Sequence, residues 1–315
     1  MKPKYLLFLI PTLILTLTQC GPKNLGAIPV MEMDTQFLPD KVNLDLVLFT
    51  TTAQGFVAST DSNVVYHTSN GGTTWNILTT LANIRRIYQN QFGDIYIDAG
   101  TIYRTNYDAS TWEPMMYSNH GSGCTLSGNI FIISYNSGRG DLQCEIYARK
   151  TGDLLLTQST KAYLNNNIII EKNHAIFHDA NESTIEFYNA DENRVTTHYL
   201  SESPLNGIFF DQQDTVAVSY ENIEKLNFND NIPLWSQYAD YNQYDFKDIH
   251  GYQGLFATVG QGCLVTNQYT EDGDWTTLVN DNFEPFSHQL LGVQVIHSKL
   301  IYAVGENGVF LKCKI

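Results

Sequence analysis

The chain of 315 residues is poor in cations and in charge of any kind. Lysine and arginine number 18 against 33 aspartates and glutamates, charged residues are 16% of the composition, and the net charge is −15. Nucleic acid binding needs a basic footprint for the phosphates, so this composition argues strongly against it. It also disfavours a protein that lies flat on an anionic bilayer. The acidity is more typical of a soluble surface than of a cationic partner.

Several signatures of catalytic and metal sites are also missing. The chain has no G-x-S-x-G elbow, no phosphate-cradling glycine loop, no C-x-x-C pair and no D-x-[DN]-x-[DN]-G calcium loop. His174 and His178 are four residues apart but lie in a strand-like stretch, which favours a structural role. No long helical periodicity follows the first twenty residues. We therefore expect an all-β chain with no metal, no cofactor and no catalytic residues.

Residues 1–19 have the pattern of a targeting segment. Lys2 and Lys4 precede an apolar run, Tyr5 to Leu17, that is too short to span a bilayer. The sequence Leu17-Thr18-Gln19-Cys20-Gly21 resembles the lipobox of bacterial lipoproteins, with Gln19 where a small residue is usual. The resemblance implies that Cys20 becomes the lipidated first residue; the alternative is an ordinary secretory signal. Loss of the two lysines would bring the net charge to −17.

A turn motif at residues 68–75 organises the rest of the chain. T-S-N-G-G-T-T-W follows the strand-like run Val64–Tyr66 and precedes a second short apolar pair. Asn-Gly-Gly tolerates positive φ, and β-branched residues on either side suit a strand pair. The motif residues are Thr68, Asn70, Gly71, Gly72, Thr74 and Trp75. The pattern predicts a β-hairpin whose structural turn ends in a buried tryptophan.

The four tryptophans indicate a repeat. Trp75, Trp112, Trp235 and Trp275 are separated by 37, 123 and 40 residues, and 123 is three times 41. Each closes a polar, turn-rich segment. A period near 40 with several short strands per unit is typical of a propeller blade.

At these residues the chain resembles the Asp-box (bacterial neuraminidase repeat) propellers. Thr68 and Asn70 stand for the serine and aspartate of S-x-D-G-G-x-T-W. The segments A-V-G-E-N-G-V-F-L at 303–311 and F-A-T-V-G-Q-G-C-L-V-T-N at 256–267 are similar to the inner hairpins of the photosystem II assembly and stability factor-like group. The resemblance covers roughly residues 43–315 and specifies fold far better than activity.

We expect a seven-bladed β-propeller, with six blades as the alternative, over residues 43–315. The units are 43–80, 81–116, 117–160, 161–200, 201–238, 239–280 and 281–315. Residues 20–42 are expected to form a tether and lead-in. The last unit has no tryptophan-bearing outer strand, so a strand near Val30–Met33 is predicted to complete it and remove a free sheet edge.

The remaining cysteines show no metal-ligand spacing. Cys124, Cys144, Cys263 and Cys313 allow up to two disulfides in an oxidising compartment, or buried free thiols. Cys124 and Cys144 fall in one unit, which makes them the candidate pair.

The residues that could form an enzymatic site have simpler structural interpretations. By family resemblance a sialidase needs converging arginines, but the six arginines all lie before residue 195. They are Arg85, Arg86, Arg104, Arg139, Arg149 and Arg194. The acidic turns at 271–274 and Asp230 are interpreted as turn caps, and the R-G-D at 139–141 as a flexible loop between strands.

We therefore predict a non-enzymatic binding or assembly scaffold, lipid-anchored by Cys20 outside the cytoplasm in a bacterial cell envelope. Its partner is expected to be a protein, or a glycan, docked on one ring face. The alternative is a glycan-binding or glycan-cleaving propeller. Carboxylates and aromatics clustered at one mouth of the central channel would favour cleavage, whereas Asn, Thr and apolar side chains there would favour binding.

Overall fold

A computed structural model describes nineteen segments of the chain, to which all structural statements below refer. They are residues 27–29, 32–89, 93–105, 111–117, 122–124, 129–136, 141–148, 153–160, 168–171, 174–179, 184–189, 194–199, 205–210, 215–219, 222–229, 232–240, 245–267, 275–279 and 287–315. None of the helical residues in these segments belongs to a helix long and apolar enough to cross a membrane.

The described strands form seven sheets. The first comprises β3 (Leu46–Phe49), β4 (Gly55–Ser59), β5 (Val64–Thr68) and β6 (Asn76–Thr80). The second comprises β7 (Arg86–Gln89), β8 (Ile95–Asp98), β9 (Thr101–Thr105) and β10 (Trp112–Tyr117). The third comprises β11 (Ser122–Cys124), β12 (Asn129–Asn136), β13 (Asp141–Ala148) and β14 (Leu154–Thr160). The fourth comprises β15 (Ile168–Glu171), β16 (His174–Asp179), β17 (Thr184–Asn189) and β18 (Arg194–Tyr199).

The remaining sheets carry the C-terminal half of the chain and both N-terminal strands. The fifth comprises β19 (Leu205–Phe210), β20 (Thr215–Ser219), β21 (Asn222–Asn229) and β22 (Ile232–Asp240). The sixth comprises β23 (Asp248–Tyr252), β24 (Leu255–Gly260), β25 (Cys263–Thr266), β26 (Thr276–Val279) and β1 (Ala27–Pro29). The seventh comprises β27 (Leu290–His297), β28 (Leu300–Gly305), β29 (Val309–Lys314) and β2 (Glu32–Phe37), with the 3-10 turn η1 (Glu306–Gly308) between β28 and β29.

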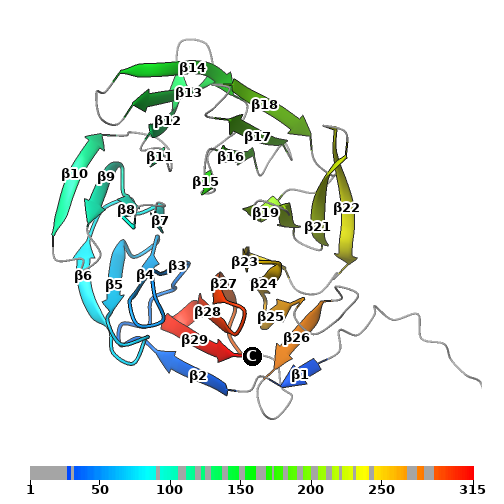
Figure 1. Cartoon of the computed structure of the whole chain (residues 1–315). Helices are drawn as coiled ribbons and strands as arrows, with labels where there is room; N and C mark the ends of the chain where they lie inside the picture. The colour runs from blue at the N-terminus through cyan, green and yellow to red at the C-terminus, as the bar shows by residue number, and fades with distance from the viewer. Residues whose placement is uncertain are drawn as a thin grey trace, which may run out of the picture.

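The sheets are arranged as a ring around a central axis (Figure 1). Strands β3 to β29 pair antiparallel within their sheets, and the innermost strands are β3, β7, β11, β15, β19, β23 and β27. The two N-terminal strands β1 and β2 lie at the outer edges of the sixth and seventh sheets. Each of the seven predicted units contains at least three strands of one sheet, although β10 and β22 extend past the predicted ends at 116 and 238, and β1 and β2 come from outside the units. The all-β propeller predicted from the sequence is therefore confirmed.

The ring is closed by the N-terminal strand β2. It pairs antiparallel with β29 from Glu32 opposite Lys314 to Phe37 opposite Val309. The predicted completion of the last unit is confirmed, although the strand starts and ends later than the Val30–Met33 run. Opposite charges face each other across this pair: Asp34 is opposite Lys312, and Glu32 forms an ion pair with Lys314 at 2.5 Å. Charge complementarity therefore favours this register.

A second N-terminal strand was not foreseen. Residues 27–29 form β1, which pairs parallel with β26 in the register Ala27–Thr277, Ile28–Leu278 and Pro29–Val279. Two strands of the ring's sheets thus come from the 20–42 segment that was expected to be tether and lead-in.

The core lies between neighbouring sheets rather than at the axis. One apolar cluster joins the first and seventh sheets around Phe49, Tyr302 and Phe310, whose rings stack with Phe49–Tyr302 centroids 3.7 Å apart. Another joins the first and second sheets through Phe56, Ile95 and Ile97. Two further clusters join the fifth, sixth and seventh sheets. Burial of each inter-sheet face is what holds the ring together.

The disulfide considered for Cys124 and Cys144 is wrong. Cys124 lies on β11 and Cys144 on β13, with β12 between them. Two strand spacings of about 4.8 Å exceed the Cα separation of about 7 Å that a disulfide spans. Cys263 and Cys313 are buried free thiols.

Candidate functional site

The predicted turn at 69–75 is a network of side-chain hydrogen bonds between β5 and β6. The buried Thr68 hydroxyl accepts the amide N–H of Gly72 at 3.0 Å and of Asn70 at 3.3 Å, and donates to Asn70 Oδ1 at 2.9 Å. Asn70 Oδ1 also accepts the amide N–H of Thr74 at 2.9 Å. Gly71 and Gly72 have φ of 70° and 91°. The residue types of the motif are thus explained by bonds within the turn.

This turn also joins the first sheet to the seventh. Trp75 lies edge-on to Phe310, with ring centroids 5.0 Å apart. A Cβ atom at Gly72 would come within 2.3 Å of the Phe310 ring. Lys312 Nζ donates to the Gly71 carbonyl at 3.4 Å, and the Tyr302 hydroxyl donates to the Thr52 carbonyl at 3.1 Å. The motif therefore has a structural role at the seam where the two ends of the chain meet.

The axis is bordered by the free edges of the innermost strands. Because β27 pairs only with β28, alternate N–H groups on its other edge need acceptors from elsewhere. Two side chains of β23 provide them. Asp248 Oδ2 accepts the N–H of Val293 at 2.9 Å, and His250 Nδ1 accepts the N–H of Val295 at 3.3 Å. We call these contacts, with those of Gln294 below, the axial staples.

Burial shifts both titratable groups toward their neutral forms. Burial raises the pKa of Asp248 to about 7. The hydrogen bonds that its carboxyl accepts from the N–H groups of Val293 and Ile249 act in the opposite direction and lower this pKa. Burial lowers the pKa of His250 to about 4. A neutral imidazole with Nδ1 as acceptor suits the bond to Val295.

A third staple joins β27 to β3. The buried side chain of Gln294 accepts the Phe49 N–H through Oε1, and its Nε2 donates to the Phe49 carbonyl at 3.3 Å. Glycines permit these close approaches: a Cβ atom at Gly292 would lie 2.7 Å from the Asp45 carbonyl, and one at Gly207 3.2 Å from the Asp248 Cα. The residues of the axial staples were not predicted from the sequence. A possible signal was the repeated L-x-G at 205–207 and 290–292, where both strands have a register irregularity.

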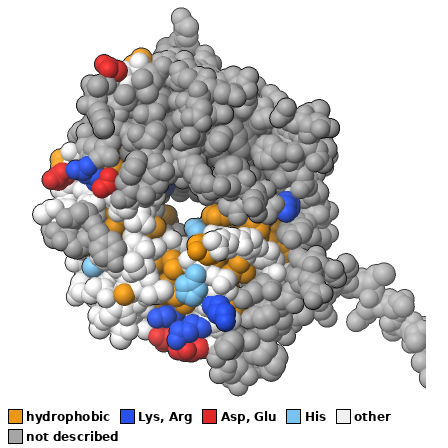
Figure 2. All heavy atoms as spheres, in the orientation of Figure 1, with side chains coloured by type: hydrophobic (Ala, Val, Ile, Leu, Met, Phe, Trp, Pro, Cys, Tyr) orange, Lys and Arg blue, Asp and Glu red, His pale blue; other side chains and the backbone are white. Residues whose placement is uncertain are grey.

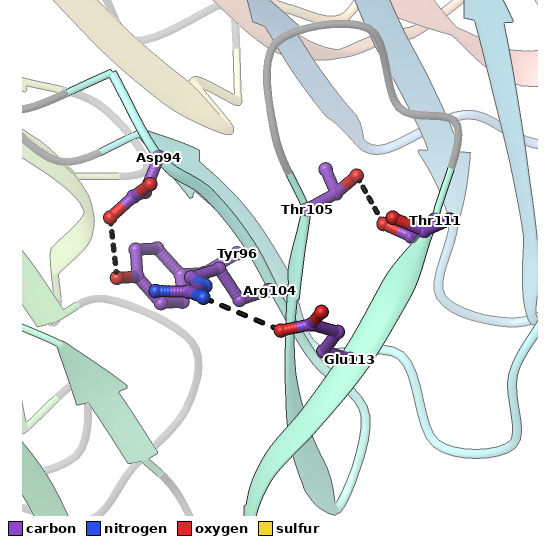
Figure 3. A network of polar contacts seen from close by, with 6 residues as sticks. All are labelled: Asp94, Tyr96, Arg104, Thr105, Thr111 and Glu113. Carbon is purple, nitrogen blue, oxygen red and sulfur yellow. Dashed lines mark hydrogen bonds and ion pairs between the residues drawn. The ribbon is translucent and has the colours of Figure 1, made fainter.

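The two described arginine side chains of the second sheet form ion pairs with carboxylates. Arg86 pairs with Asp98 at 3.0 Å, and the side chains of both are almost completely buried. Figure 3 shows Arg104 directed at Glu113, 3.4 Å away, beside Tyr96, whose hydroxyl donates to Asp94 at 3.3 Å. Both guanidinium groups are thus paired with carboxylates of their own sheet, which leaves them poorly placed to bind a substrate carboxylate.

Carboxylates are scarce on the inner strands. Among those with described side chains (β3, β7, β19, β23 and β27), Asp248 is the single acidic residue. Glycoside cleavage needs two carboxyl groups, about 5–9.5 Å apart. No group of three or more His, Cys, Asp or Glu within the described segments is placed to hold a metal ion.

Several sequence-predicted positions fall outside the described residues. These are Cys20, Arg139, Arg149, Asp230, Glu271, Asp272 and Asp274. His174 and His178 lie on β16.

Figure 2 shows one face of the ring, hollowed at its centre. Described hydrophobic side chains border the lower edge of the opening, and histidines lie beside it. Lysine or arginine side chains gather with acidic ones over β2 and β29, the strands that carry Lys312, Lys314, Glu32 and Asp34.

No protein-family model matches the chain, and no curated protein matches it. Solved structures with the same fold do. Virginiamycin B lyase from Staphylococcus aureus is 11% identical, with a TM-score of 0.67 over 90% of this chain and 100% of that one. YCF48 bound to D1 peptide is 13% identical, with a TM-score of 0.67 over 92% and 97%. The Pan2 WD40 domain from Neurospora crassa is 6% identical, with a TM-score of 0.67 over 92% and 97%. At these identities the likeness establishes the propeller fold alone.

Proposed function

We propose that this protein is a lipid-anchored binding or assembly scaffold without enzymatic activity. It is held outside the cytoplasm of a bacterial cell by acylated Cys20 and binds a protein partner through loops at one end of the ring. The observation that carries the proposal is the state of the axis. Asp248, the single carboxylate on the inner strands whose side chains are described, accepts backbone N–H groups of β23 and β27.

Exposed residues lie in loops at both ends of the first sheet. The β5–β6 turn lies at the end opposite the β4–β5 turn, because connections alternate between the ends of an antiparallel sheet. Ser69 is exposed at the first end and Asp61 at the other. Rigid sheets preorganise such loops, so little entropy is lost when a partner docks.

A structural neighbour with a bound peptide supports the binding class. YCF48 is a neighbour whose structure holds a D1 peptide, and WD40 rings share the fold, whereas virginiamycin B lyase is named as an enzyme. The arrangement of carboxylates in this chain favours the binding class.

The anchor is tested first. Metabolic labelling with an alkyne fatty acid should label the wild-type chain and place it in the membrane fraction. Cys20→Ser should lose the label and the membrane association. An unlabelled wild-type chain would contradict the anchor.

The scaffold role is tested with photo-crosslinking residues at Ser69 and, separately, at Asp61, in native membranes. These positions lie at opposite ends of one sheet, so each is the matched control for the other. We expect one stoichiometric protein adduct from one end. Absence of an adduct from both ends, together with retention on a glycan matrix and hydrolysis of that glycan, would favour the glycan-cleaving alternative.

A further inference from the structure

The sixth sheet has a strand that the other six lack. β1 adds a fifth, parallel strand to the outer edge of β26, whereas the other described sheets have four strands. Two residues later β2 forms the outer strand of the seventh sheet. The N-terminal segment is therefore attached twice along one arc of the perimeter, formed by β1, β26, β2 and β29 (Figure 1). We call this the anchor arc.

The distance from Cys20 to this arc is limited by covalent geometry. Seven residue steps separate Cys20 from Ala27, and an extended chain spans at most about 3.6 Å per residue, or about 25 Å in total. A compact domain of this length has a radius of gyration of about 19 Å, which corresponds to a width of roughly 50 Å. The tether spans at most about half the width of the ring. The part of the perimeter opposite the anchor arc therefore cannot reach the bilayer while Cys20 is anchored in it.

The charges on the described strands of the anchor arc also favour a position next to the membrane. The chain as a whole has nearly twice as many acidic as basic residues, 33 against 18. On the strands of the anchor arc, two lysines balance two acidic residues: Lys312, Lys314, Glu32 and Asp34. The exposed Lys299 lies close to this group, because its carbonyl accepts the N–H of Ile315 at the end of β29. An anionic lipid surface therefore repels the described strands of this arc less than an average part of the protein.

Resting on the acylation of Cys20 proposed above, we infer that the ring stands edge-on at the membrane. The anchor arc faces the phospholipid surface, the third sheet points away from it, and both ends of the ring stay open to partners. The lipid contact is electrostatic and adjacent to the anchor. It requires no inserted apolar segment of the ring.

The inference is tested by energy transfer to the bilayer. Acylated full-length protein is placed in vesicles of phosphatidylcholine and phosphatidylglycerol that carry a lipid-linked acceptor dye. A donor dye is attached either to Thr35→Cys on β2 or to Leu154→Cys on β14, both exposed sites on sheets at opposite sides of the ring. Cys263 and Cys313 are buried, and the labelled wild-type chain gives the background from the other thiols.

Transfer from Thr35→Cys should exceed transfer from Leu154→Cys several-fold. Insertion of about 20 Gly and Ser residues after Gly21 should abolish most of this difference, because a flexible linker then lets the ring rotate. Equal transfer from both sites in the acylated chain overturns the edge-on orientation and leaves the anchor intact. A chain without acyl label shows no transfer from either site, and the inference then fails together with the anchor.

Discussion

The Asp248 carboxylate accepts the backbone N–H of Val293, 45 residues later in the chain, at 2.9 Å. This bond links the innermost strands of two neighbouring sheets. One of those sheets, the seventh, is built from both ends of the chain. A titratable group therefore contributes to the contact between the sixth and seventh sheets.

The stability of the wild-type chain should depend on pH through Asp248. Its pKa is raised from 3.8 to about 7 in the folded protein, so the folded state binds more protons between these values. The contribution of Asp248 to the free energy of unfolding should fall as pH rises from about 4 to 7, by at most about 4 kcal/mol. Asp248→Asn cannot titrate, so the difference between wild type and variant in urea unfolding should shrink or reverse over this range. A difference that is constant with pH would refute the raised pKa.

Thr68→Val should destabilise the first sheet. The change keeps the shape but removes the acceptor for the Gly72 N–H inside a buried turn, which costs about 1–3 kcal/mol. Thr73→Val is the matched control, since Thr73 is exposed and water can replace its bond to the Asn70 carbonyl; about 0.5 kcal/mol or less is expected. Chemical denaturation of both variants measures the difference, and equal losses would contradict the role given to Thr68.

Gly72→Ala should be more damaging than Gly254→Ala. Both glycines have positive φ, 91° and 84°, so both substitutions incur backbone strain of about 1 kcal/mol or more. Only at Gly72 does the new methyl group meet the Phe310 ring, because nothing lies within 4 Å of a Cβ atom at Gly254. We expect an additional loss of about 1–3 kcal/mol for Gly72→Ala, measured as the difference in unfolding free energy.

Reversing the acidic charges of β2 should weaken ring closure in a salt-dependent way. Glu32→Lys with Asp34→Lys places lysines opposite Lys314 and Lys312. A small fall in melting temperature at low salt is expected. It should disappear at high salt, because Glu32, Asp34 and Lys314 are exposed and Lys312 is partly exposed. Adding Lys314→Glu should recover the part of the loss that comes from the Glu32–Lys314 pair, while Lys312 is kept because it also donates to the Gly71 carbonyl. Failure of this threefold variant to recover any stability at low salt would show that residues 32 and 314 do not act as a charge pair.

Local signals predicted much of the ring. Trp112 begins β10, and Trp75 and Trp275 directly precede β6 and β26, so the tryptophan period marks the start of an outer strand. Trp235 lies inside β22, which shows where the same signal is less exact. The side-chain bonds within the 68–75 turn join residues at most four positions apart, so residue type was sufficient to predict the hairpin turn.

The axial staples could not be predicted in this way. Gln294 bonds to Phe49 across 245 residues, and a glutamine within an apolar strand has no local pattern that names its partner. The same holds for His250 and Val295, which meet only because β23 and β27 are neighbours at the axis.

The sequence by itself determined the strand class, the repeat and the hairpin turn, because these depend on side-chain periodicity and on bonds between near neighbours. Only the tertiary structure decided that β1 adds parallel to β26, in which register β2 pairs with β29, and that Asp248 on β23 accepts a backbone N–H of β27. Those outcomes depend on which edges and faces the closed ring brings together, and that proximity arises from packing between sheets far apart in the chain.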